Sequence, residues 1–178
     1  MTQEYERMLL AAMAQDSREA FIELYSEYSG KALSFIVSIT GDAEASRDIV
    51  QDLFVRIWTG RREVSRVRSF NSYLFSMCRN ASLDHLKHLN VHSAYIDCHR
   101  LYMEVAANAT EESFAELEML SRIREALGRM PVRRREVFML SRMRGFSNGE
   151  IAQICGLSIQ TVDKHITNAL RDLRLALA

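Results

Sequence analysis

Residues 147–174 read SNGEIAQICGLSIQTVDKHITNALRDLR, which is the strongest structural signal in the chain. Ser147 and Glu150 have the spacing of a capping box, in which the hydroxyl and the carboxylate each accept a backbone amide hydrogen at a helix start. Gly156 tolerates the positive φ at which helices commonly end, and Ser158 is a favourable N-cap for another helix. The stretch therefore predicts two helices joined by a tight turn, the pattern of a helix-turn-helix.

The second of these helices is predicted to have two chemically different sides. Its apolar residues recur at helical spacing and predict one buried stripe: Ile159, Val162, Ile166, Ala169, Leu170 and Leu173. The other side carries Gln160, Thr161, Asp163, Lys164, Thr167, Asn168 and Arg171. Amides, hydroxyls and cations of this kind reach base edges and phosphates in a major groove. DNA binding is the favoured interpretation, and an ordinary helical hairpin with a solvated polar face is the alternative.

Composition predicts an all-α protein. The 178 residues include one proline and seven glycines, 48% of them are apolar, and no β-branched run alternates at period two. This length suits one mid-sized domain or two small ones. We expect two small helical domains, residues 1–90 and 113–178, joined by a linker at residues 91–112 that is acidic and lacks clear periodicity.

The net charge of zero hides four blocks of alternating sign. Residues 1–60 carry a net charge of −5, residues 61–92 of +4, residues 93–120 of −5 and residues 121–178 of +6. Basic segments attract nucleic acid, and acidic segments can face a basic protein partner. The pattern favours two nucleic-acid surfaces and one or two protein-facing surfaces, although helical proteins also show uneven charge by chance.

Cysteine usage and the N-terminal region indicate a cytoplasmic protein. Cys78, Cys98 and Cys155 are odd in number and widely spaced, without a CxxC pair, which is typical of a reduced intracellular chain. The N-terminal region is acidic and has no apolar segment of signal length. No apolar run is long enough to span a membrane.

Helical spacing and capping residues predict the remaining elements. We expect helices at residues 2–13, from Asp16 or Ser17 to Thr40 with a bend or break at Gly30, at residues 42–59, 70–89 and 113–128, and from Pro131 to Gly145. Residues 60–69 are predicted to form a basic loop.

Two of these helices carry candidate functional faces. On the first, Asp48, Gln51, Asp52 and Val55 lie together, and this acidic face is either solvated or a docking site for a basic partner helix. The helix at residues 70–89 follows the arginine-rich loop and groups Ser76, Arg79, Asn80, Leu83 and Lys87 on one face, which suits a nucleic-acid strand. Phe70 and Tyr73 are candidates for base stacking or, more simply, for core packing.

No catalytic or metal site is predicted. The ligand-type residues His85, His88, His92, Cys98 and His99 match no standard zinc spacing. The chain has neither a glycine-rich phosphate loop nor a nucleophile elbow. We therefore expect neither an enzyme nor a bound metal or cofactor.

Both halves together resemble a sigma factor of bacterial RNA polymerase, and more closely the small extracytoplasmic-function (ECF) group. The segments that carry this resemblance are AFIELY (residues 20–25), DIVQDLFVRIW (48–58), SFNSYLFSMCRNASLDHLK (69–87) and LGRMPVRRREVFMLSRMRGFSNGEIAQICGLSIQTVDKHITNALRDLR (127–174). The sequence departs from the family at Tyr73, where tryptophan is frequent, at Met130, where leucine is usual, and at Asp163, an acid on the reading helix. These departures bear on which promoter is read rather than on the resemblance itself.

The resemblance implies a function in promoter-specific transcription initiation and a role for each face. Docking on the coiled coil of the largest polymerase subunit is implied for Asp48, Gln51, Asp52, Phe54 and Val55. Opening and recognition of the minus-ten element are implied for Asn71, Ser72, Arg79, Asn80, Asp84 and Lys87. Recognition of the minus-thirty-five element is implied for Gln160, Thr161, Lys164, His165, Asn168 and Arg171, with Arg142 and Arg144 on the DNA backbone. The implied partners are core RNA polymerase, promoter DNA and an anti-sigma factor, commonly membrane-bound, and no small-molecule substrate.

Two other functions fit parts of the sequence. A conventional helix-turn-helix regulator, with the N-terminal half as a sensor or dimerisation domain, would bind a specific and usually palindromic DNA site without polymerase. An adaptor or anti-sigma protein would bind a protein partner and no DNA.

Overall fold

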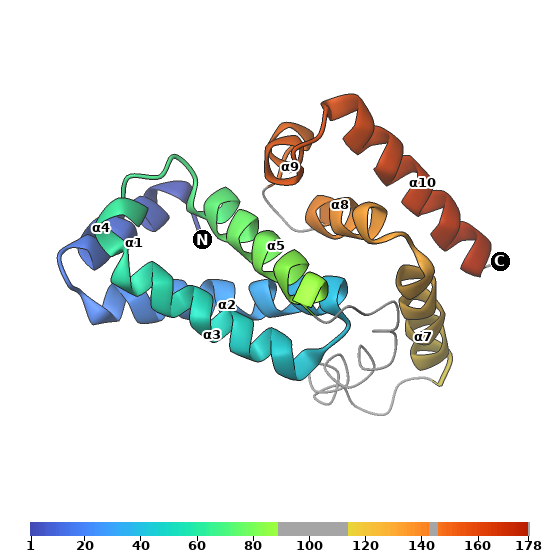
Figure 1. Ribbon diagram of the computed structural model, residues 1–178, viewed down its shortest axis with the longest axis horizontal. Helices are drawn as coiled ribbons and strands as arrows, with labels where there is room; N and C mark the ends of the chain where they lie inside the picture. The colour runs from blue at the N-terminus through green and yellow to red at the C-terminus, as the bar shows by residue number, and fades with distance from the viewer. Residues whose placement is uncertain (89–113, 143–145, 178) are drawn as a thin grey trace.

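The computed structural model describes residues 1–88, 114–142 and 146–177. Every element in these ranges is a helix, which confirms the all-α prediction. The helices are α1 (Gln3–Ala14), α2 (Arg18–Thr40), α3 (Ala43–Thr59), α4 (Arg61–Val64), α5 (Phe70–His88), α7 (Phe114–Arg129), α8 (Val132–Arg142), α9 (Asn148–Cys155) and α10 (Ile159–Leu177) (Figure 1). No helix in the described part of the chain has the length and apolar character needed to cross a bilayer.

Several sequence predictions concern residues outside these ranges. They are the linker at residues 91–112, the continuation of α8 to Gly145, the DNA contact of Arg144, and the ligand-type residues His92, Cys98 and His99. Within the described ranges, no group of three or more histidine, cysteine or acidic side chains is arranged to hold a metal ion.

Local capping sets the ends of α2 and α3. The hydroxyl of Ser17 accepts a hydrogen bond from a first-turn amide at 3.2 Å, so Ser17 rather than Asp16 begins α2. Gly41 ends α2 in the left-handed conformation, with a φ of 74°, and the carboxylate of Asp42 then accepts a first-turn amide of α3 at 3.0 Å. These side chains satisfy amides that a helix start leaves without a partner.

The structure contradicts the predicted basic loop and shows no break at Gly30. α2 runs through Gly30 without a break, because one interior glycine costs a helix only about 1 kcal/mol and the surrounding apolar residues of α2 are buried in the core. The predicted basic loop contains one helical turn, α4, in which Val64 is buried and the guanidinium of Arg61 forms an ion pair with Asp16. Contacts with α1 therefore order residues that look like a polar loop in the sequence.

The N-terminal half, α1 to α5, is organised around α2. This helix packs against α1, α3 and α5, and also against α8 from the other half of the chain (Figure 1). Buried aromatic rings fill the space beside it, with ring centroids 5.4 Å apart for Phe35 and Phe75 and 5.2 Å apart for Tyr28 and Phe70. Burial of each such ring stabilises the fold by about 1.5–3 kcal/mol, so α5 is firmly attached to α2.

The C-terminal half, α7 to α10, does not bury all of its apolar residues within itself. A small cluster of Met130, Phe138 and Ala169 packs inside this half. Val137 of α8 and Ile151 of α9, in contrast, belong to the same core as the aromatic rings of the N-terminal half. In the arrangement of Figure 1, α8 contacts α2 and α9 contacts α5. One continuous apolar core therefore joins the two halves.

Candidate nucleic-acid and polymerase interface

The helix-turn-helix forms as predicted from α9 and α10. The hydroxyl of Ser147 accepts the Glu150 amide at 3.3 Å, and the carboxylate of Glu150 accepts the Ser147 amide at 2.8 Å, which completes the capping box. Gly156 ends α9 with a φ of 64°. Asn148 Nδ2 donates to Asp163 Oδ1 at 2.6 Å and so ties the start of α9 to the outer side of α10. Asp163, the acid on α10, therefore has a structural partner, which sequence reasoning missed.

α10 is amphipathic, as expected, with one exception. Val162 and Ala169 are fully buried, and Ile166, Leu170 and Leu173 are partly buried beside them. Ile159 was expected in this stripe but is 52% exposed, so that prediction is wrong. It is the first residue of α10 and directly follows the turn, whereas the buried positions lie at least three residues further along the helix.

The predicted minus-thirty-five residues lie on the accessible side of α10. Gln160, Lys164 and Arg171 are exposed, and Thr161, His165 and Asn168 are partly exposed. The Thr161 hydroxyl lies 2.8 Å from that of Ser158, and the Thr161 amide donates to Ser158 Oγ at 3.2 Å, so this threonine also helps to cap the helix.

Electrostatics distinguish His165 from its neighbours. Partial burial, followed by the positive charges of Arg134 and Arg133, lowers the pKa of His165. The imidazole is thereby favoured in its neutral form, which offers one donor and one acceptor instead of a cation. Arg134 itself forms an ion pair with Asp172 of α10.

Arg142, predicted to contact the DNA backbone, is exposed near the C-terminal end of α8. Its guanidinium carbon lies 5.0 Å from the centroid of the Phe138 ring, a cation–π geometry that holds the side chain against its own helix. The position is compatible with a phosphate contact at the edge of the helix-turn-helix.

The predicted minus-ten residues on α5 are divided between solvent and protein. Asn80, Asp84 and Lys87 are exposed, and Lys87 Nζ lies 2.8 Å from Asp84 Oδ1, which lowers the pKa of that carboxyl. Asn71 and Ser72 are partly buried at the start of the helix.

The nearby aromatic side chains have different environments. Phe70 is fully buried against Tyr28, so it packs in the core and is not a stacking platform. Tyr73 is partly exposed and packs against the edge of the core.

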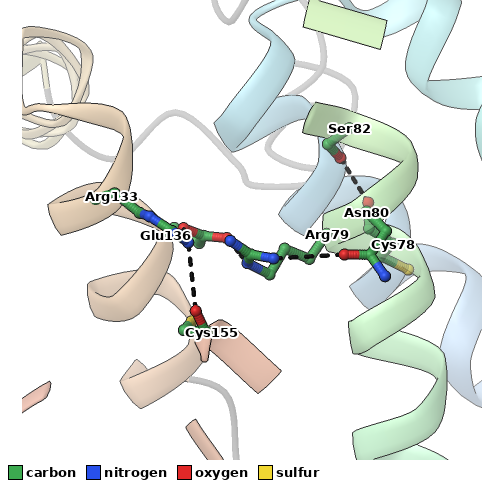
Figure 2. Close-up of polar contacts among 7 residues, drawn as sticks. All are labelled: Cys78, Arg79, Asn80, Ser82, Arg133, Glu136 and Cys155. Atoms are coloured by element: carbon green, nitrogen blue, oxygen red, sulfur yellow. Dashed lines mark hydrogen bonds and ion pairs between the residues drawn. The ribbon is translucent and has the colours of Figure 1, made fainter. Parts of the chain in front are cut away.

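Arg79 lies in an environment that the sequence does not predict. Its side chain is 11% exposed and forms an ion pair with Glu136 of α8, which is fully buried (Figure 2). Arg79 Nη1 also donates to Asn80 Oδ1 at 3.4 Å. A residue expected on a nucleic-acid surface is thus covered by the other half of the molecule.

The predicted polymerase-docking residues lie on α3. Asp48, Gln51 and Asp52 are exposed, and Val55 is 63% exposed beside them. Phe54 is only 2% exposed, because its ring packs 4.8 Å from that of Tyr25 in α2. In this conformation Phe54 supports the face from within.

The structure extends this face onto α2. Ile22 and Tyr25 are large apolar residues that remain exposed on α2. The ring contact between Tyr25 and Phe54 places Tyr25 next to α3, and Ile22 lies one helical turn before Tyr25. Sequence reasoning missed both residues. The signal was present in AFIELY, where apolar residues occupy more than one side of the helix.

Comparison with known proteins identifies the family. Residues 24–90 match the sigma-70 region 2 family and residues 120–173 the sigma-70 region 4 family. Ferric citrate uptake sigma factor FecI of Escherichia coli K12 is 29% identical over 84% of this chain and 86% of its own length. ECF RNA polymerase sigma factor SigL of Mycobacterium tuberculosis is 26% identical over 86% of both chains. The structure of CnrH in complex with the cytosolic domain of CnrY has a TM-score of 0.69 at 26% identity and covers 97% of this chain and 96% of that one. The chain is therefore an ECF sigma factor that carries sigma-70 regions 2 and 4.

Proposed function

We propose a division of labour among three faces of this ECF sigma factor, which directs promoter-specific transcription initiation by core RNA polymerase. The face of α3 docks on the polymerase, α5 contacts the minus-ten element, and α10 reads the minus-thirty-five element. One observation carries the proposal: Gln160, Lys164 and Arg171 are exposed on a helix whose opposite side, at Val162 and Ala169, is fully buried. This is the geometry of a recognition helix.

The polymerase face combines charge with apolar surface. Asp48 and Asp52 supply negative charge, while Val55, Ile22 and Tyr25 supply exposed apolar area. A basic amphipathic helix is the partner that such a surface fits, because its cations pair with the carboxylates and its apolar side covers the rest. Phe54 holds α2 and α3 together beneath this surface.

On α5, the proposed nucleic-acid contacts extend along the helix from Asn71 and Ser72 through Arg79 and Asn80 to Lys87. A base removed from the stack costs a few kcal/mol, and amide and cationic side chains that bind it and its phosphates can offset this cost. Asp84 orients Lys87 through their ion pair.

On α10, Gln160 and Asn168 are the proposed base readers, and Lys164 and Arg171 are proposed to contact bases or phosphates. Thr161 and the neutral His165 add short polar contacts, and Arg142 approaches the backbone from α8. Arg144 is included on the resemblance alone.

The charge distribution explains why polymerase is needed. The whole chain has no net charge, because its acidic segments offset its basic segments, so free binding to DNA should be weak. Polymerase would hold both halves on one promoter, which turns two weak contacts into one effective contact. Its site of action would be the cytoplasm, where polymerase and promoter are found, and no enzymatic activity is proposed.

An anti-sigma factor is the proposed regulatory partner. The relative CnrH was solved in complex with the cytosolic domain of CnrY. The exposed apolar residues on α2 and α3 offer a similar protein a surface that overlaps the proposed polymerase face.

The decisive experiment mixes the purified protein with sigma-free core polymerase and a library of promoter fragments. Arg171→Ala is expected to reduce promoter use about tenfold to hundredfold, the usual effect of one base or phosphate contact, without weakening polymerase binding. Asp52→Asn is expected to weaken polymerase binding. Arg129→Ala on α7 and Glu4→Gln on α1 are controls, because each removes an exposed charge of the same sign from a helix that carries none of the proposed faces.

Equal loss of polymerase binding in Arg171→Ala and Asp52→Asn would show that the faces are wrongly assigned. Tight binding to one DNA site by the protein alone, without any transcript, would instead favour the helix-turn-helix regulator.

A further inference from the structure

The ion pair between Arg79 and Glu136 joins the two halves of the molecule. Figure 2 shows the two side chains reaching toward each other, Arg79 from α5 and Glu136 from α8. Arg133 Nη1 lies 3.3 Å from the other carboxylate oxygen of Glu136 and 3.4 Å from the Cys155 carbonyl oxygen, to which it donates. One fully buried carboxylate is thus shared by two guanidiniums, one from each half.

This arrangement makes the closed state depend on Arg79. A buried carboxylate is costly unless cations and hydrogen bonds compensate its charge. Within its own half, Glu136 is paired with Arg133, whose side chain is 49% exposed. The distance of 3.3 Å between Arg133 Nη1 and the Glu136 carboxylate is long for an ion pair. The guanidinium of Arg79 is the more deeply buried partner, so its removal leaves Glu136 poorly compensated as long as the halves stay together.

Two other polar contacts cross the same interface, and both are long. Ser72 Oγ donates to Glu150 Oε1 at 3.4 Å, and Arg135 Nη2 donates to the Ile39 carbonyl oxygen at 3.4 Å. Hydrogen bonds of this length are weak. The rings of Phe75 and Phe146, with centroids 5.2 Å apart, supply an apolar contact. The interface therefore combines the apolar core that joins the two halves, which includes Val137 and Ile151, with polar groups that water or an anion can satisfy after separation.

The covered residues belong to the proposed minus-ten face. Ser72 and Arg79 are held by the C-terminal half, whereas Asn80, Asp84 and Lys87, which follow them along α5, remain exposed. A nucleic-acid strand could reach only part of this face while the halves are together. A phosphate and a carboxylate are both anions that a guanidinium binds by charge-assisted hydrogen bonds, so they compete for the same side chain.

We propose that Glu136 is an internal competitor for promoter DNA, which keeps the minus-ten face of the free sigma factor closed by occupying Arg79. The inference rests on the proposed function of α5. Separation of α8 and α9 from α2 and α5 frees Arg79 for the DNA strand and leaves Glu136 with Arg133 at a newly hydrated surface. Recognition of the minus-ten element is thereby coupled to opening of the protein.

The first test measures opening without DNA or polymerase. Small-angle X-ray scattering of the full chain is expected to show a larger radius of gyration for Arg79→Gln and for Glu136→Gln than for the wild type. Arg134→Gln is the matched control, because it breaks an arginine–carboxylate pair that lies entirely within the C-terminal half. A cooperative melting transition by circular dichroism establishes that each variant is folded.

The second test separates the competitor from the DNA contact. Glu136→Gln should raise the affinity for a single-stranded fragment of the non-template minus-ten region by about tenfold, equivalent to about 1.4 kcal/mol. Arg79→Gln should open the protein as much as Glu136→Gln does. Its affinity for the fragment should not rise, because the cation that binds the DNA is absent. Arg134→Gln should behave as the wild type in both tests.

Three results would overturn the proposal, and the first two differ from a failure of the proposed function. If neither Arg79→Gln nor Glu136→Gln enlarges the protein, the ion pair does not control closure, even if Arg79→Gln loses promoter use as the proposed function requires. If Glu136→Gln opens the protein without a gain in DNA affinity, the carboxylate does not compete with DNA. If Arg79→Gln gains as much affinity for the DNA fragment as Glu136→Gln, then Glu136 and the DNA do not compete for Arg79. The proposed role of Arg79 in promoter binding then fails as well.

Discussion

α5 and α10 carry similar polar side chains but differ in how accessible those side chains are. On α10, Gln160, Lys164 and Arg171 are exposed to solvent. On α5, Arg79 is paired with a buried carboxylate and Ser72 contacts Glu150. The difference arises from what packs against each helix: α10 is the outer helix of its own half, whereas α5 lies between α2 and α9 (Figure 1). The availability of a residue for DNA is therefore a property of packing and not of residue type.

The acidic face of α3 completes this comparison. Asp48, Asp52 and Val55 are exposed in the same conformation in which Arg79 is covered. Under the proposed function, polymerase can therefore dock on α3 before the minus-ten face opens. Such an order would restrict promoter melting to the sigma factor that is already bound to polymerase.

The largest expected effect concerns the attachment of α5. Phe75 is buried between Phe35 of α2 and Phe146, which precedes α9. Phe75→Ala should lower the free energy of unfolding by about 3–5 kcal/mol, because it removes a ring and leaves a cavity shared by both halves. Chemical denaturation followed by circular dichroism measures this loss. Val162→Ala in α10 removes less volume, so an equal or larger loss there would contradict the central role of α5.

A smaller effect is expected for base readout by α10. Gln160→Ala should reduce discrimination at one base pair of the minus-thirty-five element by about 1–3 kcal/mol, since an amide can bond two atoms of one base edge. Transcription from a promoter series mutated at each position gives the change in preference. Uniform weakening on all promoters, with no position relaxed, would assign Gln160 to the phosphate backbone.

The smallest expected effect is the pH response of His165. Burial and the nearby Arg134 and Arg133 lower the pKa of His165 below the ordinary value of 6.5. The imidazole therefore binds a proton more readily in the unfolded chain than in the folded chain. The contribution of His165 to stability is therefore present above pH 6.5 and is lost as the pH falls toward the lower folded value. An NMR titration of the imidazole measures the shift directly. A His165 pKa at or above 6.5 would contradict the packing of α10 described here, and His165→Gln should remove this part of the pH dependence of unfolding.

Much of the fold follows from local sequence signals. The capping residues Ser17, Asp42 and Ser147, together with Gly41 and Gly156, begin and end helices where the sequence predicts. Capping needs only a side chain and an amide a few residues away, so such signals can be read without knowledge of the rest of the chain. The structure departs from the sequence predictions at Gly30 and at the loop over α4, where contacts with distant helices outweigh a local preference.

The candidate site is divided in the same way. The sequence by itself determined the helix-turn-helix, the polar side of α10 and the acidic side of α3, because helical periodicity places these residues on common faces. Only the tertiary structure decided that Arg79 would meet Glu136 and that Ser72 would meet Glu150. Those pairs lie 57 and 78 residues apart in the chain. Their formation depends on how α8 and α9 pack against α2 and α5, and a pattern within one helix carries no information about which distant charge will cover it.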